Sequence, residues 1–228
     1  MRVENIINDY VLGYVENNGL DFLNQGFLYR NMASEQNYSV LNQALLSIYC
    51  RQHNIKNNVF FGSYMQIKEM GGKIMTGSTG ALLTYFRNCN SGGRLAYYHS
   101  FPLCNTSIYA DFAGLQDDYI YPDKLYETDN LLQKGSEKTD KELPRDNRLD
   151  TEEYFRKAIV FLAKNLEPQT NDNLTNTLTA SYLLAQCGLS RGAEKENLAE
   201  LKNKMKSDTN YFIRSAGTAQ KKIKGLLN

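Results

Sequence analysis

The sequence predicts an α+β fold, with N-terminal helices and a small antiparallel sheet followed by a mostly helical C-terminal half. Apolar residues recur at helical spacing in segments near both ends of the chain. Between them lie short apolar and aromatic runs, two of which flank a turn rich in Asn and Gly. With 228 residues and 42% hydrophobic content the chain can bury a core, so we expect a soluble globular protein.

Three helices are expected before the sheet, at residues 5–23, 39–52 and 63–70. Ser39 and Ser63 precede the apolar periods and suit the N-cap position, where a side-chain oxygen accepts a backbone N–H. Gly19 and Gly71-Gly72 mark helix ends, because Gly readily adopts the left-handed conformation that closes a helix. Strands should follow at residues 73–75, 81–86 and 94–101, with a turn at residues 88–93 between the last two.

The polar and acidic stretch from residue 117 to 150 has little apolar periodicity, which favours a linker or mobile loop. Three helices are expected after it, at residues 151–165, 173–186 and 194 to the C-terminus, the last broken near Ser207-Asp208. We therefore predict an N-terminal domain over residues 1–116, an acidic linker over 117–150 and a helical domain over 151–228.

Charge is unevenly distributed, although the net charge is only +1. Residues 22–110 carry seven Lys/Arg and two Asp/Glu, residues 111–153 carry six and thirteen, and residues 154–228 carry twelve and six. Basic blocks that flank an acidic connector suit a polyanionic partner, and an ordinary solvated surface explains them equally well. The chain has no apolar run of membrane-span length and its N-terminus is too polar for a signal peptide, so we expect a cytoplasmic protein without membrane contact.

Residues 61–80 combine the residue types that bind single-stranded nucleic acid: rings that stack on bases, polar side chains, and glycines that let a phosphate approach backbone N–H groups. The same residues also have a structural explanation, because aromatics usually pack in the core and glycines usually form turns. The rings, polar groups and basic residues of this hypothesis are Phe60, Phe61, Tyr64, Gln66, Lys68 and Lys73, extended by Arg51, Lys56 and Arg87.

The order of these residues resembles the N-terminal single-strand-binding domain of ArdC-type antirestriction proteins and related conjugative-plasmid primases. That pattern has a Tyr-x-x-x-Asn, two aromatics around a Ser, a Gln, a Lys and a Gly-Gly turn. It matches Tyr38, Asn42, Phe61, Ser63, Tyr64, Gln66, Lys68, Gly71, Gly72, Ile74 and Gly77. The resemblance implies single-stranded DNA as ligand, with Tyr38, Asn42, Phe61, Tyr64 and Gln66 as the best contact candidates. This chain has Met75, Thr76, Ser78 and Thr79 where the family tends to carry Lys or Arg, so a weaker affinity or a changed target is expected.

The second half also resembles this family, in which a zinc metallopeptidase-like domain follows the first. Such a domain needs His-Glu-x-x-His on one helix, where two His one turn apart face the metal, and a third ligand from a later helix. The chain has only His53 and His99, the expected helix over residues 152–165 has none, and the expected acidic ligand falls on Thr177. A degenerate metallopeptidase that is not an enzyme, with no metal and no cofactor, is therefore predicted.

Other catalytic or metal sites have weaker support. The four cysteines form no CxxC pair and are typical of reduced, packed thiols. Cys50 and His53 form a C-x-x-H pair on a predicted helix, and a zinc site that joins them to His99 and Cys104 stays open, as does a Cys–His nucleophile. The glycines lack the Gly-Lys-Ser/Thr ending of a phosphate-binding P-loop.

These observations favour a non-enzymatic, single-stranded-DNA-binding accessory or antirestriction protein of a mobile genetic element such as a plasmid or phage. Single-stranded DNA is the expected partner, and a host defence protein is a second one. The alternative is a protein-binding inhibitor of a host defence complex, in which the acidic connector mimics nucleic acid or docks onto a basic partner.

Overall fold

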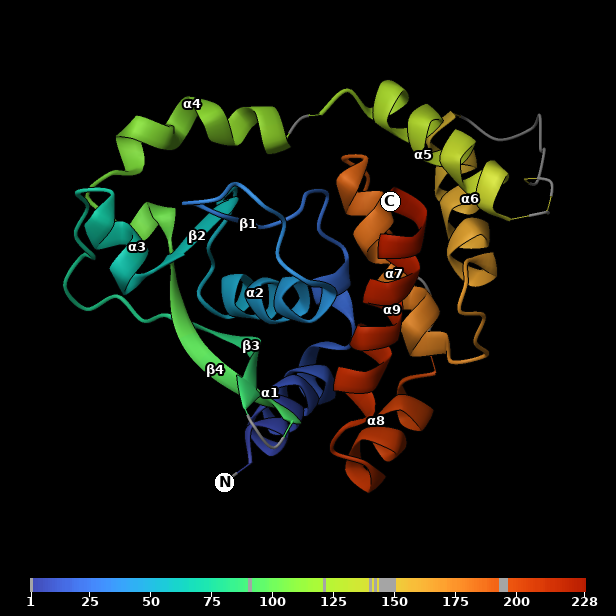
Figure 1. The fold of residues 1–228 in the computed structure, drawn as a ribbon, viewed down its shortest axis with the longest axis horizontal. Coiled ribbons are helices and arrows are strands. Elements are labelled where there is room, and N and C mark those ends of the chain that lie inside the picture. The colour runs from blue at the N-terminus through green and yellow to red at the C-terminus, as the bar shows by residue number, and fades with distance from the viewer. Residues whose placement is uncertain are drawn as a thin grey trace. The chain divides into compact units, whose positions relative to one another are not determined.

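The computed structural model describes residues 2–89, 92–120, 122–139, 141, 143, 151–192 and 197–228. The chain divides into two compact units, unit 1 with Met1–Phe22 and Leu28–Ile120, and unit 2 with Leu23–Phe27 and Tyr121–Asn228. Unit 1 combines helices with a sheet, whereas unit 2 is helical (Figure 1). The α+β class expected from the sequence is confirmed.

The first helices of unit 1 match the three expected ones, as α1 (Val3–Asn18), α2 (Val40–Gln52) and α3 (Tyr64–Glu69). The Ser39 side chain accepts the Asn42 N–H at the start of α2. Ser63 and Gln66 form a reciprocal capping box at the start of α3. These bonds satisfy N–H groups that the first turn of a helix leaves without a partner.

The sheet of unit 1 has the strand order β1-β2-β4-β3. β3 (Ala81–Cys89) and β4 (Gly92–Pro102) form the expected antiparallel hairpin, and β2 (Phe60–Ser63) pairs antiparallel with β4. β1 (Arg30–Asn31) pairs parallel with β2, so the sheet is mixed instead of wholly antiparallel. Residues 90 and 91 of the predicted turn lie outside the described residues.

The strand expected at residues 73–75 does not form. Ile74 makes only an isolated bridge to Thr106, while the Lys73 N–H donates to the Ser107 hydroxyl at 2.9 Å. Residues 73–75 are therefore hydrogen-bonded to the loop before α4 (Tyr109–Ile120), and neither segment forms a regular strand. A three-residue segment with a single bridge to its neighbour is too short to extend a sheet.

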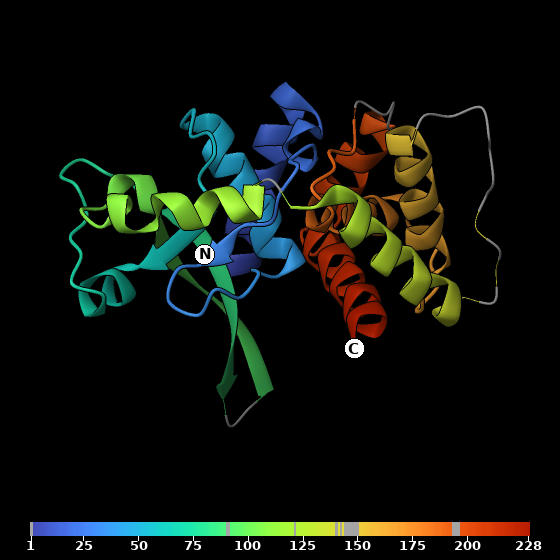
Figure 2. The same ribbon diagram turned by 90° about the horizontal axis from the view of Figure 1, so that it is seen from above.

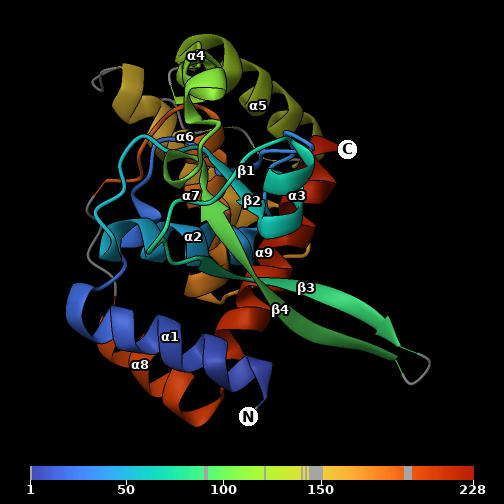
Figure 3. The ribbon, with the colours of Figure 1, turned by 90° about the vertical axis from the view of Figure 1, so that its left-hand side faces the viewer.

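The core of unit 1 lies between α2 and the proximal half of the hairpin. Leu45 and Ile48 of α2 are buried, as are Phe60 and Phe61 of β2 and Leu83 of β3. Beyond these residues the hairpin leaves the core and projects from the rest of the unit (Figures 2 and 3). Its distal side chains are consequently exposed to solvent.

The expected linker over residues 117–150 is largely helical. It contains the end of α4 and the whole of α5 (Lys124–Lys138), which begins at Asp123, whose side chain accepts the Tyr126 N–H. The linker prediction failed here because α5 is amphipathic and buries Leu131 and Leu132 although its composition is polar. Residues 144–150 of the predicted linker lie outside the described residues.

Unit 2 is built around the buried helix α7 (Asn173–Gln186), which packs against α6 (Thr151–Asn165) and α9 (Tyr211–Leu227). α8 (Leu198–Ser207) precedes α9, and the break between them lies at the expected Ser207-Asp208. The predicted start of this last segment, at residue 194, lies outside the described residues. Among the described helices, none has the length and apolar content needed to cross a bilayer.

Candidate nucleic-acid interface

The distal half of the β3–β4 hairpin exposes several large aromatic side chains. Phe86 is 72% exposed, Tyr85 46% and Tyr97 45%. Exposed rings on a projecting element are unusual, because their burial would otherwise stabilise the fold. Aromatic rings that face solvent are the platforms on which single-stranded bases stack.

The register divides these side chains between the two faces of the hairpin. Residues directly opposite each other share a face, and successive residues alternate between faces. Phe86 lies opposite Leu95 and next to Tyr97 on one face. Tyr85 lies on the other face, with its ring 5.9 Å from that of Tyr98 in a T-shaped arrangement. Both faces of the distal hairpin therefore offer a ring.

Two arginines lie at the far end of the hairpin. Arg87 and Arg94 are direct cross-strand partners, and both are exposed. Like charges placed directly opposite each other destabilise a β-hairpin. A polyanion that bound both guanidinium groups would remove this repulsion.

Helix α3 carries a second exposed group in the same unit. Tyr64 is 58% exposed, and Lys68 lies one helical turn further on the same face. Lys73 is also exposed, in the loop after the Gly71-Gly72 turn. Of the predicted contact residues, Tyr64, Lys68, Lys73 and Arg87 are thus accessible to a ligand, as is Lys56 in the loop after α2.

The remaining predicted contact residues have structural roles. Phe61 is buried, with its ring 5.5 Å from that of Tyr29, so it has no face to offer to a base. The buried Tyr38 hydroxyl donates to the Phe61 carbonyl at 3.0 Å. Asn42 is buried against Thr84 of the edge strand β3.

Two further predicted residues are also occupied. Gln66 caps α3 and exchanges hydrogen bonds with the Asn31 side chain at 3.2 and 3.3 Å. Arg51 forms an ion pair with Asp21 at 3.1 Å. For Tyr38, Asn42, Phe61 and Gln66, the sequence pattern therefore reports the residues that build this domain, not its exposed surface.

Four exposed residues of the hairpin were not among the predicted contacts: Tyr85, Phe86, Arg94 and Tyr97. The sequence does contain a signal for them. A strand with one solvated face alternates apolar and polar residues, but the two runs next to the turn at residues 88–93 have apolar or aromatic residues at successive positions. Arg94 is found by pairing outward from this turn, which places it opposite Arg87.

The cysteine and histidine hypotheses find no support in the geometry. Burial raises the pKa of the Cys50 thiol to about 12, which favours the protonated thiol over the nucleophilic thiolate. The His53 ring lies against Tyr49, with ring centroids 4.4 Å apart. Across the described part of the chain, no group of three or more His, Cys, Asp and Glu side chains is placed to hold a metal ion.

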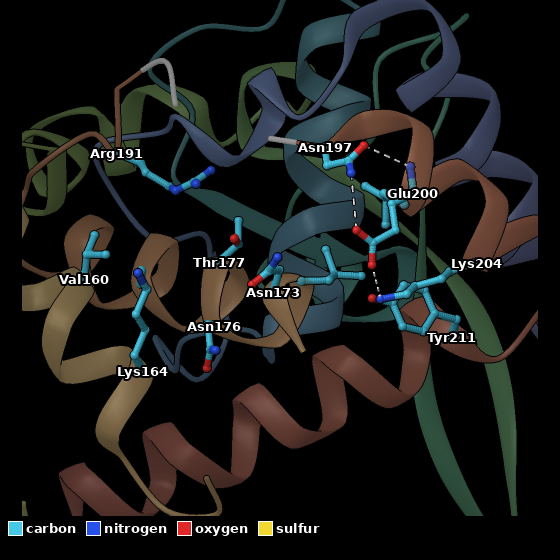
Figure 4. Close-up of a pocket in the computed structure, with 13 residues that line it drawn as sticks. Val160, Lys164, Asn173, Asn176, Thr177, Arg191, Asn197, Glu200, Lys204 and Tyr211 are labelled. Carbon is cyan, nitrogen blue, oxygen red and sulfur yellow. Dashed lines mark hydrogen bonds and ion pairs between the residues drawn. The ribbon is translucent and has the colours of Figure 1, made fainter. Parts of the chain in front are cut away.

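Unit 2 contains a cavity of about 220 Å³ between α6, α7, α8 and the start of α9 (Figure 4). Val160 and Lys164 of α6, which are one turn apart, and Thr177 of α7 all line it. Two His and an acidic residue at this spacing would form a metal site, but here the side chains are an isopropyl group, an ammonium and a hydroxyl. These three residues do not fit a divalent metal.

Comparisons with known proteins agree with this description of both units. Residues 17–96 match the family model for the N-terminal domain of anti-restriction factor ArdC. Two crystal structures of the antirestriction protein ArdC from plasmid R388 are similar over 100% of this chain and 97% of theirs. The Mn(II)-bound structure has a TM-score of 0.75 at 13% identity, and the metal-free structure 0.74 at 14%. No curated protein matches the chain. Residues 17–96 therefore resemble the N-terminal domain of ArdC, and the chain as a whole has the fold of these ArdC structures.

Proposed function

We propose that this chain is an antirestriction or anti-defence protein of a mobile genetic element that acts by binding single-stranded DNA without catalysis. Its biological role is inferred from the fold it shares with ArdC, which is described as an antirestriction protein of plasmid R388. The DNA-binding activity is inferred from the hairpin. The observation that carries it is the cross-strand pair Arg87–Arg94, which shares one face of the distal hairpin with the exposed ring of Tyr85. The exposed rings of Phe86 and Tyr97 lie on the other face.

The side chains of the hairpin tip destabilise the free protein, and binding of single-stranded DNA would make their interactions favourable. The like-charged pair costs up to about 1 kcal/mol, and the exposed rings contribute little to folding. A single strand reverses both effects. Its phosphates neutralise Arg87 and Arg94, and stacking of a base on an aromatic ring contributes about 1–3 kcal/mol. The exposed Tyr64 and Lys68 of α3 offer the same combination of ring and cation in unit 1.

The non-enzymatic part of the proposal concerns unit 2. One of the similar ArdC structures is described as Mn(II)-bound. In this chain the helix that would carry the ligand pair presents Val160 and Lys164 to the cavity, and α7 presents Thr177. An isopropyl group cannot coordinate a cation, and an ammonium repels one. The cavity therefore supports a scaffold or a different ligand better than a metallopeptidase.

A salt titration tests DNA binding directly. Fluorescence anisotropy of a labelled oligothymidylate should show binding that weakens as salt rises, with a log–log slope of about −0.7 for each phosphate contact. The double change Arg87→Ser, Arg94→Ser should reduce this slope by about 1.4. Lys221→Ser with Lys224→Ser, exposed positions on α9, removes the same charge and should leave the slope unchanged.

Stacking is tested separately with Phe86→Ala. This change should weaken binding by about 1–3 kcal/mol, with little effect on the salt slope. Tyr126→Ala removes a ring of similar exposure from unit 2 and serves as the control. A flat titration at low ionic strength would overturn the DNA-binding proposal. A partner that survives nuclease treatment in a pull-down would then support a protein-binding inhibitor.

A further inference from the structure

One face of the distal β3–β4 hairpin, which we call the charged face, combines cations with rings. Arg87 and Arg94 are cross-strand partners on it, and the exposed Tyr85 lies two positions before Arg87. The Tyr98 ring packs against that of Tyr85, with centroids 5.9 Å apart. Cations beside rings suit a single strand, because the strand offers phosphates and unpaired bases together. This face therefore has the chemistry that the proposed function requires.

The opposite face, which we call the apolar face, has a different chemistry. It consists of the cross-strand pair Phe86–Leu95 and of Tyr97, two positions from Leu95 on the same strand. Phe86 and Tyr97 are exposed and Leu95 is partly exposed. None of the described side chains on this face between residues 86 and 97 is charged. Attraction to a DNA backbone comes from Lys and Arg, so this face is not built for phosphates.

The apolar face is wider than a single base requires. Directly opposite residues of two antiparallel strands have Cβ atoms about 5 Å apart, and diagonal neighbours are about 7–8 Å apart. Phe86 is directly opposite Leu95 and diagonal to Tyr97. A base stacks on one ring, whereas three apolar side chains at these separations form a broader platform. The end base pair of a duplex is a broad, flat surface with its phosphates at the margin, and it fits this platform.

The two faces lie back to back on one two-stranded ribbon that projects from unit 1 (Figure 3). Phe86 of the apolar face stands in the sequence between Tyr85 and Arg87 of the charged face. Ligands on the two faces are therefore separated only by the thickness of one sheet layer. Apolar side chains such as Phe and Leu can unstack base pairs by inserting between them. At the end of a duplex the last pair has one face free already, so covering it requires no unstacking.

We propose that the hairpin binds the junction between single- and double-stranded DNA, a substrate that rests on the proposed function and narrows it. The apolar face packs on the last base pair of the duplex. The charged face holds the single strand that leaves this pair. On a strand without a duplex the rings of both faces stack on separate bases, so Phe86 contributes to oligothymidylate binding as well.

Fluorescence anisotropy of the full chain with labelled DNAs tests this proposal. The DNAs are oligothymidylate, a blunt duplex, and the same duplex with an oligothymidylate tail at the 3′ or the 5′ end of one strand. We expect one of the tailed duplexes to bind at least about fivefold more tightly than oligothymidylate or the blunt duplex, because one further stacking contact forms. A 2-aminopurine in the base pair at the junction should change its fluorescence on binding, and one in the middle of the duplex should not.

The variant Leu95→Thr alters the apolar face without a change of charge, so an effect on the preference cannot be electrostatic. Thr keeps a high β-propensity, and Leu95 is not a ring on which a lone base stacks. The change should reduce the preference for the tailed duplex to below about twofold and leave the Kd for oligothymidylate within about twofold. Tyr85→Thr on the charged face is the matched control. It should weaken binding of both DNAs by the same factor and so keep the preference, and circular dichroism should show both variants folded.

Equal binding of oligothymidylate and both tailed duplexes by the wild-type protein would overturn the junction proposal and leave the proposed function intact. An unchanged preference in Leu95→Thr would also overturn it, and would leave the apolar face to a protein partner. Absence of binding to any of these DNAs would overturn the proposed function and the junction proposal together, so the two failures are distinguishable.

Discussion

The Asn42 side chain forms three hydrogen bonds with Thr84 and thereby joins α2 to the edge strand β3. Its Nδ2 donates to the Thr84 carbonyl at 2.9 Å, and its Oδ1 accepts the Thr84 N–H at 2.9 Å and hydroxyl at 3.0 Å. β3 pairs with β4 on one side only, so its other edge needs partners for its backbone groups. A single buried amide thus anchors the base of the projecting hairpin.

We predict that Asn42→Ala lowers the free energy of unfolding by about 2–3 kcal/mol. The change leaves the N–H and carbonyl of Thr84 buried without a partner, and each such group is costly. Urea denaturation measures this loss. Asn17→Ala, at an exposed position of α1, should stay within about 0.5 kcal/mol of wild type. Equal stability of both variants would show that water replaces the Asn42 amide at this edge.

The cross-strand pair Arg87–Arg94 leads to a prediction with opposite signs for stability and binding. Arg94→Thr removes the like-charge contact and adds a β-branched residue, so it should stabilise the free protein by about 0.2–1 kcal/mol. The same change should weaken oligothymidylate binding, because one phosphate contact is lost. Thermal unfolding and anisotropy on the same samples test both. Stabilisation without weaker binding would mean that the arginine pair has no nucleic-acid role.

The lining of the unit 2 cavity predicts that a metal site can be restored. The triple change Val160→His, Lys164→His, Thr177→Glu places two imidazoles one turn apart on α6 and a carboxylate on the adjoining α7. We expect this variant to bind Zn²⁺ stoichiometrically after dialysis, and the wild-type protein to bind none at these positions. Elemental analysis provides the measurement. The variant with Lys164→His alone is the control and should retain no metal.

Burial of Cys50 predicts a loss of stability at alkaline pH. Its pKa is raised from an ordinary value near 9 to about 12, so between these values the unfolded thiol loses a proton that the folded one keeps. Stability should therefore fall as pH rises through this window, by at most about 1.4 kcal/mol per pH unit from this group. Cys50→Ala should reduce the slope of the free energy of unfolding against pH. Tyr29, which hydrogen-bonds the thiol, is present in both proteins. Urea denaturation of reduced protein at pH 8, 9 and 10 would contradict this prediction if the two slopes agree.

Much of the fold follows from local sequence signals. The helix starts at Ser39 and Ser63 are visible because a hydroxyl at the N-cap acts on its own neighbours. The expected hairpin is likewise a local structure, joined by a short turn. The resemblance to the ArdC N-terminal domain expected from the order of residues between Tyr38 and Gly77 is also confirmed.

The failed predictions concern contacts between distant segments. Composition made residues 117–150 look unstructured, yet α5 gains a buried face from its neighbours in unit 2. Residues 73–75 pair with residues 105–107 through two backbone hydrogen bonds and one isolated bridge, which is too short a ladder for a regular strand. Neither outcome is encoded within the segment itself.

The sequence by itself determined the α+β class, the positions of most helices, the resemblance to ArdC and the absence of a His-Glu-x-x-His motif, because these depend on neighbouring residues or on residue identity alone. Only the tertiary structure decided which side chains remain exposed. It buried Phe61 and Tyr38, left Phe86 and Tyr97 in solvent, and brought Lys164 and Arg191 to one cavity. Exposure is a property of packing between segments far apart in the chain, and local pattern does not specify it.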